Sequence, residues 1–91
     1  MQYGYIRVST KEQQDHRQHM AMAQRGIIPA NIYAEKLSDK DANRPKLRAL
    51  LNKVKKGDTL VVEAISRFAR NTKDLLELVE RLKHKKVHLS V

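Results

Sequence analysis

The stretch YIRVST at residues 5–10 begins as a β-strand and ends in polar side chains. Its apolar residues favour an extended backbone, and Arg7 and Ser9 alternate with them. The run stops at Thr10, where a helix can begin. Two interpretations follow from the residues alone. One is a hydrogen-bonded arginine followed by a helix cap, and the other is a nucleophilic hydroxyl with an anion-binding guanidinium beside it.

Strands and helices are predicted to alternate along the rest of the chain. The predicted strands are residues 2–8, 31–35, 59–65 and 87–91. The predicted helices are residues 10–25, a segment that starts at Pro45 and a segment capped by Asn71 and Thr72. Such alternation is typical of an α/β fold, so we expect a mainly parallel sheet of about four strands flanked by helices.

Signals at the helix ends and along the helix faces support this alternation. Residues 10–13, TKEQ, fit a capping box in which Thr10 and Gln13 satisfy the first turn, and Gly26 is placed to end the same helix. The two later helices each carry an apolar stripe with helical spacing. These stripes are Leu47, Leu50, Leu51 and Val54 in one helix, and Leu75, Leu78, Val79 and Leu82 in the other.

The size and composition of the chain restrict what it can be. Its 91 residues make one domain or part of one. The absence of cysteine excludes a disulfide framework, a thiolate metal site and a cysteine nucleophile. No apolar run approaches the roughly 20 residues that a membrane helix needs, and the N-terminus lacks the pattern of a secretory signal. We therefore expect a cytoplasmic protein without a membrane partner.

The charge of the chain points to nucleic acid. Nineteen Lys and Arg residues against ten Asp and Glu give a net charge of +9, and the isoelectric point is near 10.1. Such a balance is typical of proteins that neutralise phosphates, although a solvated basic surface is the alternative. Only three Tyr, one Phe and no Trp are present, which argues against base stacking on single strands.

Polar clusters follow three of the predicted strands, where ligands gather in parallel sheets. They are Arg7 with Ser9, the polar stretch 36–44, and SRFAR at residues 66–70. Arg44, Arg67 and Arg70 are therefore expected to join Arg7 at one edge of the sheet. Arg67 and Arg70 would share a face if residues 66–70 were helical. Because SRFAR contains no acidic residue, we expect unpaired guanidiniums that attract a phosphate.

Metal chemistry is a weaker interpretation of the same sequence. Two histidine pairs and a set of carboxylates have spacings that could hold a metal, but no motif frames them, and solvated helix faces are more typical of such pairs. These residues are His16, His19, His84, His88, Asp39, Asp41 and Glu63. The carboxylates would belong to a metal-dependent nuclease or phosphatase. No glycine-rich phosphate loop is present.

Four blocks of the sequence resemble, in order and spacing, the N-terminal catalytic domain of the serine recombinases, the resolvases and DNA invertases. They are YGYIRVST (3–10), NRPKLRALL (43–51), GDTLVV (57–62) and SRFARNTKDL (66–75). The resemblance covers residues 1–91. It implies site-specific recombination of double-stranded DNA, whether resolution, inversion or integration, through a covalent 5′-phosphoserine. It also implies a 3′-hydroxyl leaving group and no metal or other cofactor.

The resemblance assigns roles to individual residues. Ser9 matches the nucleophile of the family, and Arg7 matches the arginine beside the scissile phosphate. The other matched residues are the catalytic arginines Arg44, Arg67 and Arg70 and the assisting glutamines Gln13 and Gln18. With Ser9 as nucleophile, Thr10 would be the helix cap. No histidine lies in the motifs, so the group that deprotonates Ser9 stays open.

Two departures from the family pattern bear on function. Ser66 stands where many resolvases have an aspartate. The family also continues with a further strand, a long dimerisation helix and usually a DNA-binding domain. The resemblance therefore implies a catalytic domain without its C-terminal part, inactive in recombination alone, from a parent that forms dimers or tetramers. A relative that binds DNA phosphates without cutting is the alternative function.

Overall fold

The computed structural model describes residues 1–9, 16–37 and 44–91, and of Ser9 and Leu37 only the backbone. Four parallel strands form one sheet in the order β2-β1-β3-β4. The strands are β1 (Gln2–Ser9), β2 (Ile32–Leu37), β3 (Thr59–Val62) and β4 (His88–Ser90). The predicted parallel α/β sheet of about four strands is therefore confirmed.

Helices cover both faces of this sheet. α1 (His16–Gln24) packs on one face, and a short 3₁₀ helix, η1 (Pro29–Asn31), leads from it into β2. The other face carries α2 (Pro45–Lys53), the single-turn α3 (Ile65–Phe68) and α4 (Thr72–Lys85). Within the described segments, no helix has the length and apolar character needed to cross a membrane.

The first strand lies inside the sheet and is apolar on both faces. Tyr5 belongs to the large core under α2, α3 and α4, whereas Ile6 belongs to the smaller core under α1. A strand buried on both faces needs a continuous apolar run rather than strict alternation. Gly4 leaves room for the close approach of α1, because a Cβ atom there would lie 2.9 Å from Sδ of Met22, which would have to shift.

The predicted helix ends are confirmed wherever they are described. Gly26 follows α1 with a φ of +85°, and the N–H of Ile27 reaches back to the carbonyl of Met22, a Schellman arrangement. Oδ1 of Asn71 accepts the N–H of Asp74 at 2.8 Å and so caps α4. Pro45 is the first residue of α2, as expected. The capping box at residues 10–13 lies outside the described residues.

Three details of the sequence prediction were wrong. The third strand ends at Val62 instead of residue 65, because Ala64 is already the N-cap of α3 and Ile65 is its first residue. The second strand continues through Leu37, two residues beyond the prediction. Val79 was assigned to the core but is 39% exposed. The stripe that α4 buries is narrow and centres on its other predicted members, so Val79 lies beside it.

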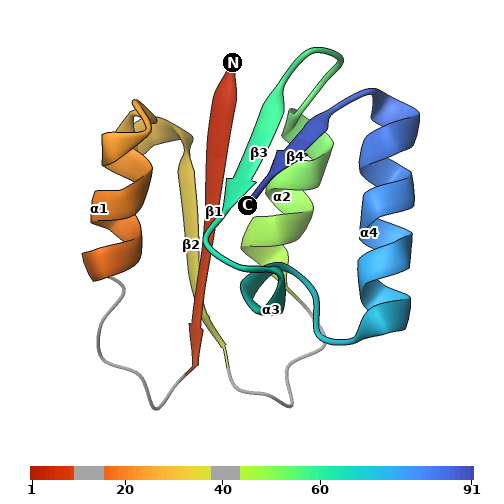
Figure 1. Ribbon diagram of the computed structural model, residues 1–91, viewed down its shortest axis with the longest axis horizontal. Helices are drawn as coiled ribbons and strands as arrows, with labels where there is room; N and C mark the ends of the chain where they lie inside the picture. The colour runs from red at the N-terminus through yellow and green to blue at the C-terminus, as the bar shows by residue number, and fades with distance from the viewer. Residues whose placement is uncertain (10–15, 38–43) are drawn as a thin grey trace.

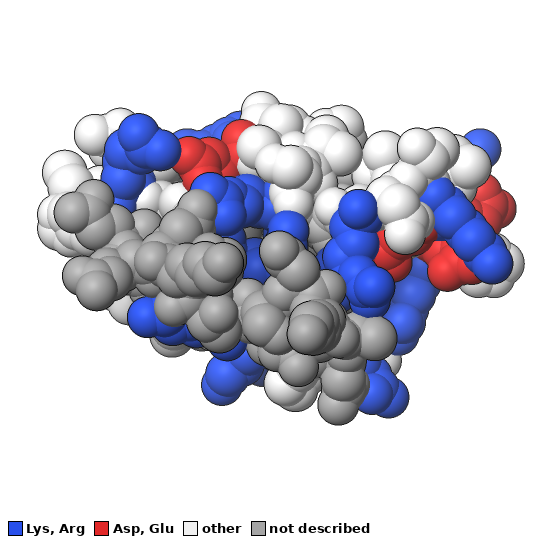
Figure 2. Space-filling model, turned by 90° about the horizontal axis from the view of Figure 1, so that it is seen from below, with Lys and Arg blue, Asp and Glu red and all other residues white. Residues whose placement is uncertain are grey.

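The carboxyl ends of the strands define one edge of the molecule. In Figure 1 the strands run toward the lower edge, where α3 and the beginning of α4 lie. Figure 2 looks onto this edge and shows Lys and Arg side chains gathered around it. Ligands of parallel α/β sheets bind at such an edge, so the candidate site is sought there.

Candidate active site

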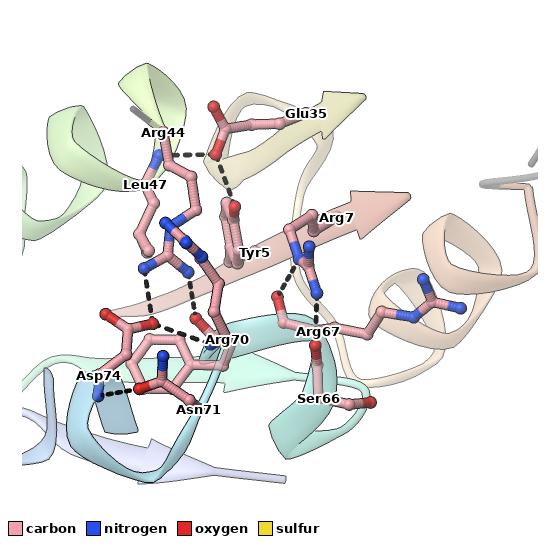
Figure 3. A network of polar contacts seen from close by, with 11 residues as sticks. Tyr5, Arg7, Glu35, Arg44, Leu47, Ser66, Arg67, Arg70, Asn71 and Asp74 are labelled. Carbon is pink, nitrogen blue, oxygen red and sulfur yellow. Dashed lines mark hydrogen bonds and ion pairs between the residues drawn. The ribbon is translucent and has the colours of Figure 1, made fainter. Parts of the chain in front are cut away.

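Arg7 leaves the carboxyl end of β1 and reaches α3. Its Nη2 donates to the carbonyl oxygen of Ser66 at 2.6 Å, and its Nε donates to the carbonyl oxygen of Arg67 at 3.4 Å (Figure 3). Carbonyls near the end of a one-turn helix have no partner within that helix, so a guanidinium is a natural donor to them. The predicted meeting of the first and third polar clusters is confirmed.

Arg44 is buried and makes an ion pair, contrary to the expectation of unpaired guanidiniums. It precedes Pro45, and its side chain is only 8% exposed. Nη1 donates to the carbonyl oxygen of Phe68 at 2.6 Å, and Nη2 donates to Oδ2 of Asp74 at 2.8 Å. The expectation rested on the absence of acidic residues within SRFAR. The neutralising carboxylate lies four residues beyond that motif, in the first turn of α4.

A buried carboxylate that the sequence reasoning missed holds the start of α2. Glu35 of β2 accepts three hydrogen bonds, from the hydroxyl of Tyr5 at 2.5 Å and from the backbone N–H groups of Lys46 and Leu47 at 2.9 and 3.2 Å. A negative charge at a helix N-terminus is favourable. The sequence did offer one signal. The residue before Pro45 is Arg44, whose side chain cannot accept the N–H groups at the helix start, so an acceptor from elsewhere in the chain was to be expected.

Tyr5 is held in its neutral form by this arrangement. Burial of the ring is the main cause, and the hydrogen bond to Glu35 and the charge of that carboxylate act in the same direction. Together they raise the pKa of Tyr5 far above its ordinary value of 10.0. The phenol is therefore a hydrogen-bond donor that fixes Glu35 on the side of the core next to Arg44.

Residues 66–70 are not helical throughout, so the condition under which Arg67 and Arg70 would share a helix face is not met. Arg67 lies within α3, which ends at Phe68, and Ala69 is extended with φ of −122° and ψ of 147°. Arg70 follows outside the helix. Figure 3 shows the two guanidiniums pointing away from each other, with that of Arg70 on the side of Arg44. The motif therefore presents its two arginines to different parts of the edge.

A pocket of about 340 Å³ lies between α3, the start of α4 and the end of β1. It brings together two of the predicted arginines, Arg7 and Arg70, with the exposed residue Ser66. The remaining lining residues are Ile65, Ala69, Asn71, Thr72 and Leu75. Two guanidiniums beside a helix N-terminus form a positively charged cavity that suits an anion.

The other predicted site residues are placed only in part. Ser9 is the last residue of β1 and pairs with Leu37 of β2, but its side chain, like all of Gln13, lies outside the described residues. Gln18 is on the buried side of α1 and is 4% exposed. Its Oε1 has no hydrogen-bond partner among the described residues.

Those candidate metal ligands that the structure describes do not form a metal-binding group. Within residues 1–9, 16–37 and 44–91, no group of three or more His, Asp or Glu side chains could hold an ion. Glu63 instead pairs with Arg17 at 3.8 Å. Asp39 and Asp41 lie outside the described residues.

Comparison with known proteins shows the family to which this sequence belongs. A family model described as "Resolvase, N terminal domain" matches residues 2–91. The chain belongs to this resolvase family. It is 40% identical over 85 residues to a resolvase of Clostridium perfringens and 41% identical over 86 residues to the transposon Tn21 resolvase of Escherichia coli. It is also 39% identical over 88 residues to a DNA-invertase of Escherichia phage P1.

The three alignments cover nearly all of this resolvase-family domain and less than half of each relative. They include 93%, 94% and 97% of the chain, but 45%, 44% and 46% of the respective relatives. The chain thus spans a little under half the length of the curated relatives it matches. The resemblance recognised in the four sequence blocks is confirmed at the level of the family.

Proposed function

We propose that this resolvase-family domain carries the catalytic site for site-specific recombination of double-stranded DNA, with Ser9 as the nucleophile. The observation that carries the proposal is the position of Ser9 two residues beyond Arg7, at the sheet edge that also holds Arg44 and Arg70. The relatives named resolvase and DNA-invertase support the same reaction class. The whole recombinase is proposed to act as a dimer or tetramer in the cytoplasm.

The proposed chemistry is a phosphoryl transfer that conserves the phosphodiester. The hydroxyl oxygen of Ser9 forms a bond to phosphorus, and the bond from phosphorus to the 3′-oxygen breaks. The Ser9 proton is lost, and the departing oxygen takes up a proton to become a 3′-hydroxyl. The 5′-phosphate stays on Ser9. Attack by a different 3′-hydroxyl reverses these steps, so rejoining needs no nucleotide cofactor.

The arginines are proposed to stabilise the charge that develops on the phosphate oxygens. A guanidinium has five N–H donors, and the two described hydrogen bonds of Arg7 use two of them. Those bonds fix its plane, and Arg7 also lines the pocket shared with Arg70. Preorganised donors of this kind need not rearrange during the reaction. Arg67 is proposed to act on the phosphate with the other arginines, and Gln13 and Gln18 are proposed to assist.

A cleavage assay in excess chelator tests this function. The recombinase that carries residues 1–91 is incubated with DNA bearing its recombination site, and a denaturing gel asks whether protein becomes attached to the 5′ end at the cut. We expect an adduct with the wild-type protein and none with Ser9→Ala, which removes only the nucleophilic oxygen. Binding of the site by both proteins checks that the variant is folded.

Each other outcome identifies a different function. Tight binding of the site without an adduct in the wild type would favour a regulatory protein that binds DNA phosphates and does not cut. Cleavage that requires metal and survives Ser9→Ala would favour a metal-dependent nuclease. Either result would contradict the proposed role of Ser9.

A further inference from the structure

One oxygen of Asp74 joins two of the arginines proposed to act on phosphate. Oδ2 accepts from Nη2 of Arg44 at 2.8 Å and from the backbone N–H of Arg70 at 2.9 Å (Figure 3). Asp74 was not among the residues that the sequence predicted for the site. Because both contacts are made by one atom, the separation of Arg44 from the Arg70 backbone is set by Asp74.

Asp74 is itself held firmly. Its N–H donates to Oδ1 of Asn71 at 2.8 Å, and it lies in the first turn of the 14-residue helix α4. That helix is anchored in the core by Leu78 and Leu82. Because the side chain is short and its helix is anchored, the Asp74 carboxylate has a well-defined position. Supporting residues of this kind fix the geometry of a site.

The chemistry of Asp74 suits support rather than contact with the phosphate. A carboxylate next to a phosphate would repel it, whereas the charge of Asp74 is neutralised by the buried guanidinium of Arg44. Arg44 in turn donates to the carbonyl of Phe68, the last residue of α3. The pair therefore ties the start of α2 to the α3–α4 connection that carries Arg70.

We propose that Asp74 is a positioning residue of the strand-exchange site. It holds Arg44 and the Arg70 backbone together, and so keeps Arg70 where it lines the pocket with Arg7. This inference rests on the proposed function of the domain. Replacing Asp74 is therefore expected to slow the chemical step and to change the affinity for DNA only slightly.

The test compares two charge-matched variants of the recombinase that carries residues 1–91. Asp74→Asn keeps the shape of the side chain but removes the charge that pairs with Arg44. Glu77→Gln removes the same charge from an exposed position on the same helix. Single-turnover adduct formation is measured at saturating DNA, alongside the dissociation constant at the same salt.

We expect Asp74→Asn to slow adduct formation about 10- to 100-fold, the cost of misplacing a catalytic group by about 1 Å. Its dissociation constant should stay within about threefold of wild type, because the number of phosphate contacts is unchanged. Glu77→Gln should keep the wild-type rate within about twofold, as surface substitutions do. Arg44→Ala combined with Asp74→Asn should be slower than wild type by less than the product of the two single effects, because Asp74 acts in part through Arg44.

Circular dichroism at the assay temperature separates positioning from unfolding. If Asp74→Asn is not folded there, Asp74→Glu replaces it and is expected to show the same loss of rate while folded. A folded Asp74 variant with the wild-type rate would overturn the inference and leave the proposed function standing. So would a double variant slower by the product of both single effects. Absence of any adduct in the wild-type protein would instead overturn the proposed function, and the inference with it.

Discussion

Glu35 shows how a buried carboxylate can be satisfied by neutral donors. Its two oxygens accept from the hydroxyl of Tyr5 and from two N–H groups of α2. Buried polar networks stabilise a single arrangement when every member is paired, and they are costly when one partner is removed. Tyr5 therefore supports Glu35, which in turn holds the start of the helix that follows Arg44.

The pH dependence of stability tests this network. The folded protein keeps the proton of Tyr5 above pH 10.0, where the unfolded chain releases it. Stability from this group is therefore fully present below about pH 10 and is lost as pH rises. We expect the unfolding free energy of the wild type to fall by about 1.4 kcal/mol per pH unit more than that of Tyr5→Phe, above about pH 10.

Urea denaturation of both proteins from about pH 8 to about pH 12 makes the comparison. Other titrating groups are common to the two proteins and cancel in the difference. Below about pH 10, Tyr5→Phe should be less stable by about 1 to 3 kcal/mol, because a buried charged acceptor loses a donor. Parallel curves throughout the range would contradict a phenol that stays protonated in the fold.

At the scale of elements, the single turn α3 is the connection between core and site. Phe68 buries its ring in the main core, while the carbonyls of Ser66, Arg67 and Phe68 accept from Arg7 and Arg44. A helix this short cannot satisfy its own last carbonyls. The two arginines therefore hold α3 in place, so their substitution should affect folding as well as chemistry.

The C-terminus of α4 offers a direct test of how the helices end. Lys86 has a φ of 60° and a ψ of 42°, a left-handed conformation that glycine adopts without steric cost. We expect Lys86→Gly to raise the unfolding free energy by about 0.5 to 1 kcal/mol. The matched control is Lys83→Gly, which removes the same charge inside the helix and should lower it by about 1 kcal/mol.

Thermal unfolding of the three proteins measures both effects. For a domain of this size, a change of 1 kcal/mol shifts the midpoint by about 4–8 °C. A Lys86→Gly variant that melts below the wild type would show that the lysine side chain contributes more than its backbone conformation costs.

At the scale of the whole molecule, the sequence was sufficient to predict the sheet and the convergence of Arg7, Arg44 and SRFAR at one edge. Apolar runs, capping residues and Gly26 are local signals, and parallel topology brings strand ends together. The partners of the arginines were not predictable in this way. Asp74 and Glu35 meet Arg44 and Tyr5 only across 30 residues of sequence, and no local pattern encodes those pairs.

The net charge of +9 predicts that the affinity for DNA depends on the salt concentration. The effect of removing one positive charge should depend on where that charge lies. Arg70 lies at the carboxyl edge of the sheet, whereas Lys56 lies at the opposite edge, in the turn before β3. We expect Arg70→Ala to reduce the slope of log K against log salt concentration by about 0.9, the value for one phosphate contact. Lys56→Ala removes the same charge and should leave the slope unchanged.

Fluorescence anisotropy over a range of salt concentrations measures these slopes with one labelled duplex. Equal reductions in the two variants would indicate that DNA responds to the overall charge of the domain and not to the carboxyl edge.

The most direct test of the central claim is the identity of the residue that carries DNA. The covalent adduct is trapped, its DNA is digested to a short 5′-phosphorylated remnant, and tryptic peptides are sequenced by tandem mass spectrometry. Cleavage after Arg7 and Lys11 yields the peptide VSTK, residues 8–11, which contains both Ser9 and Thr10. We expect the remnant on the Ser9 oxygen. A remnant on Thr10, or on any residue outside this peptide, would contradict it.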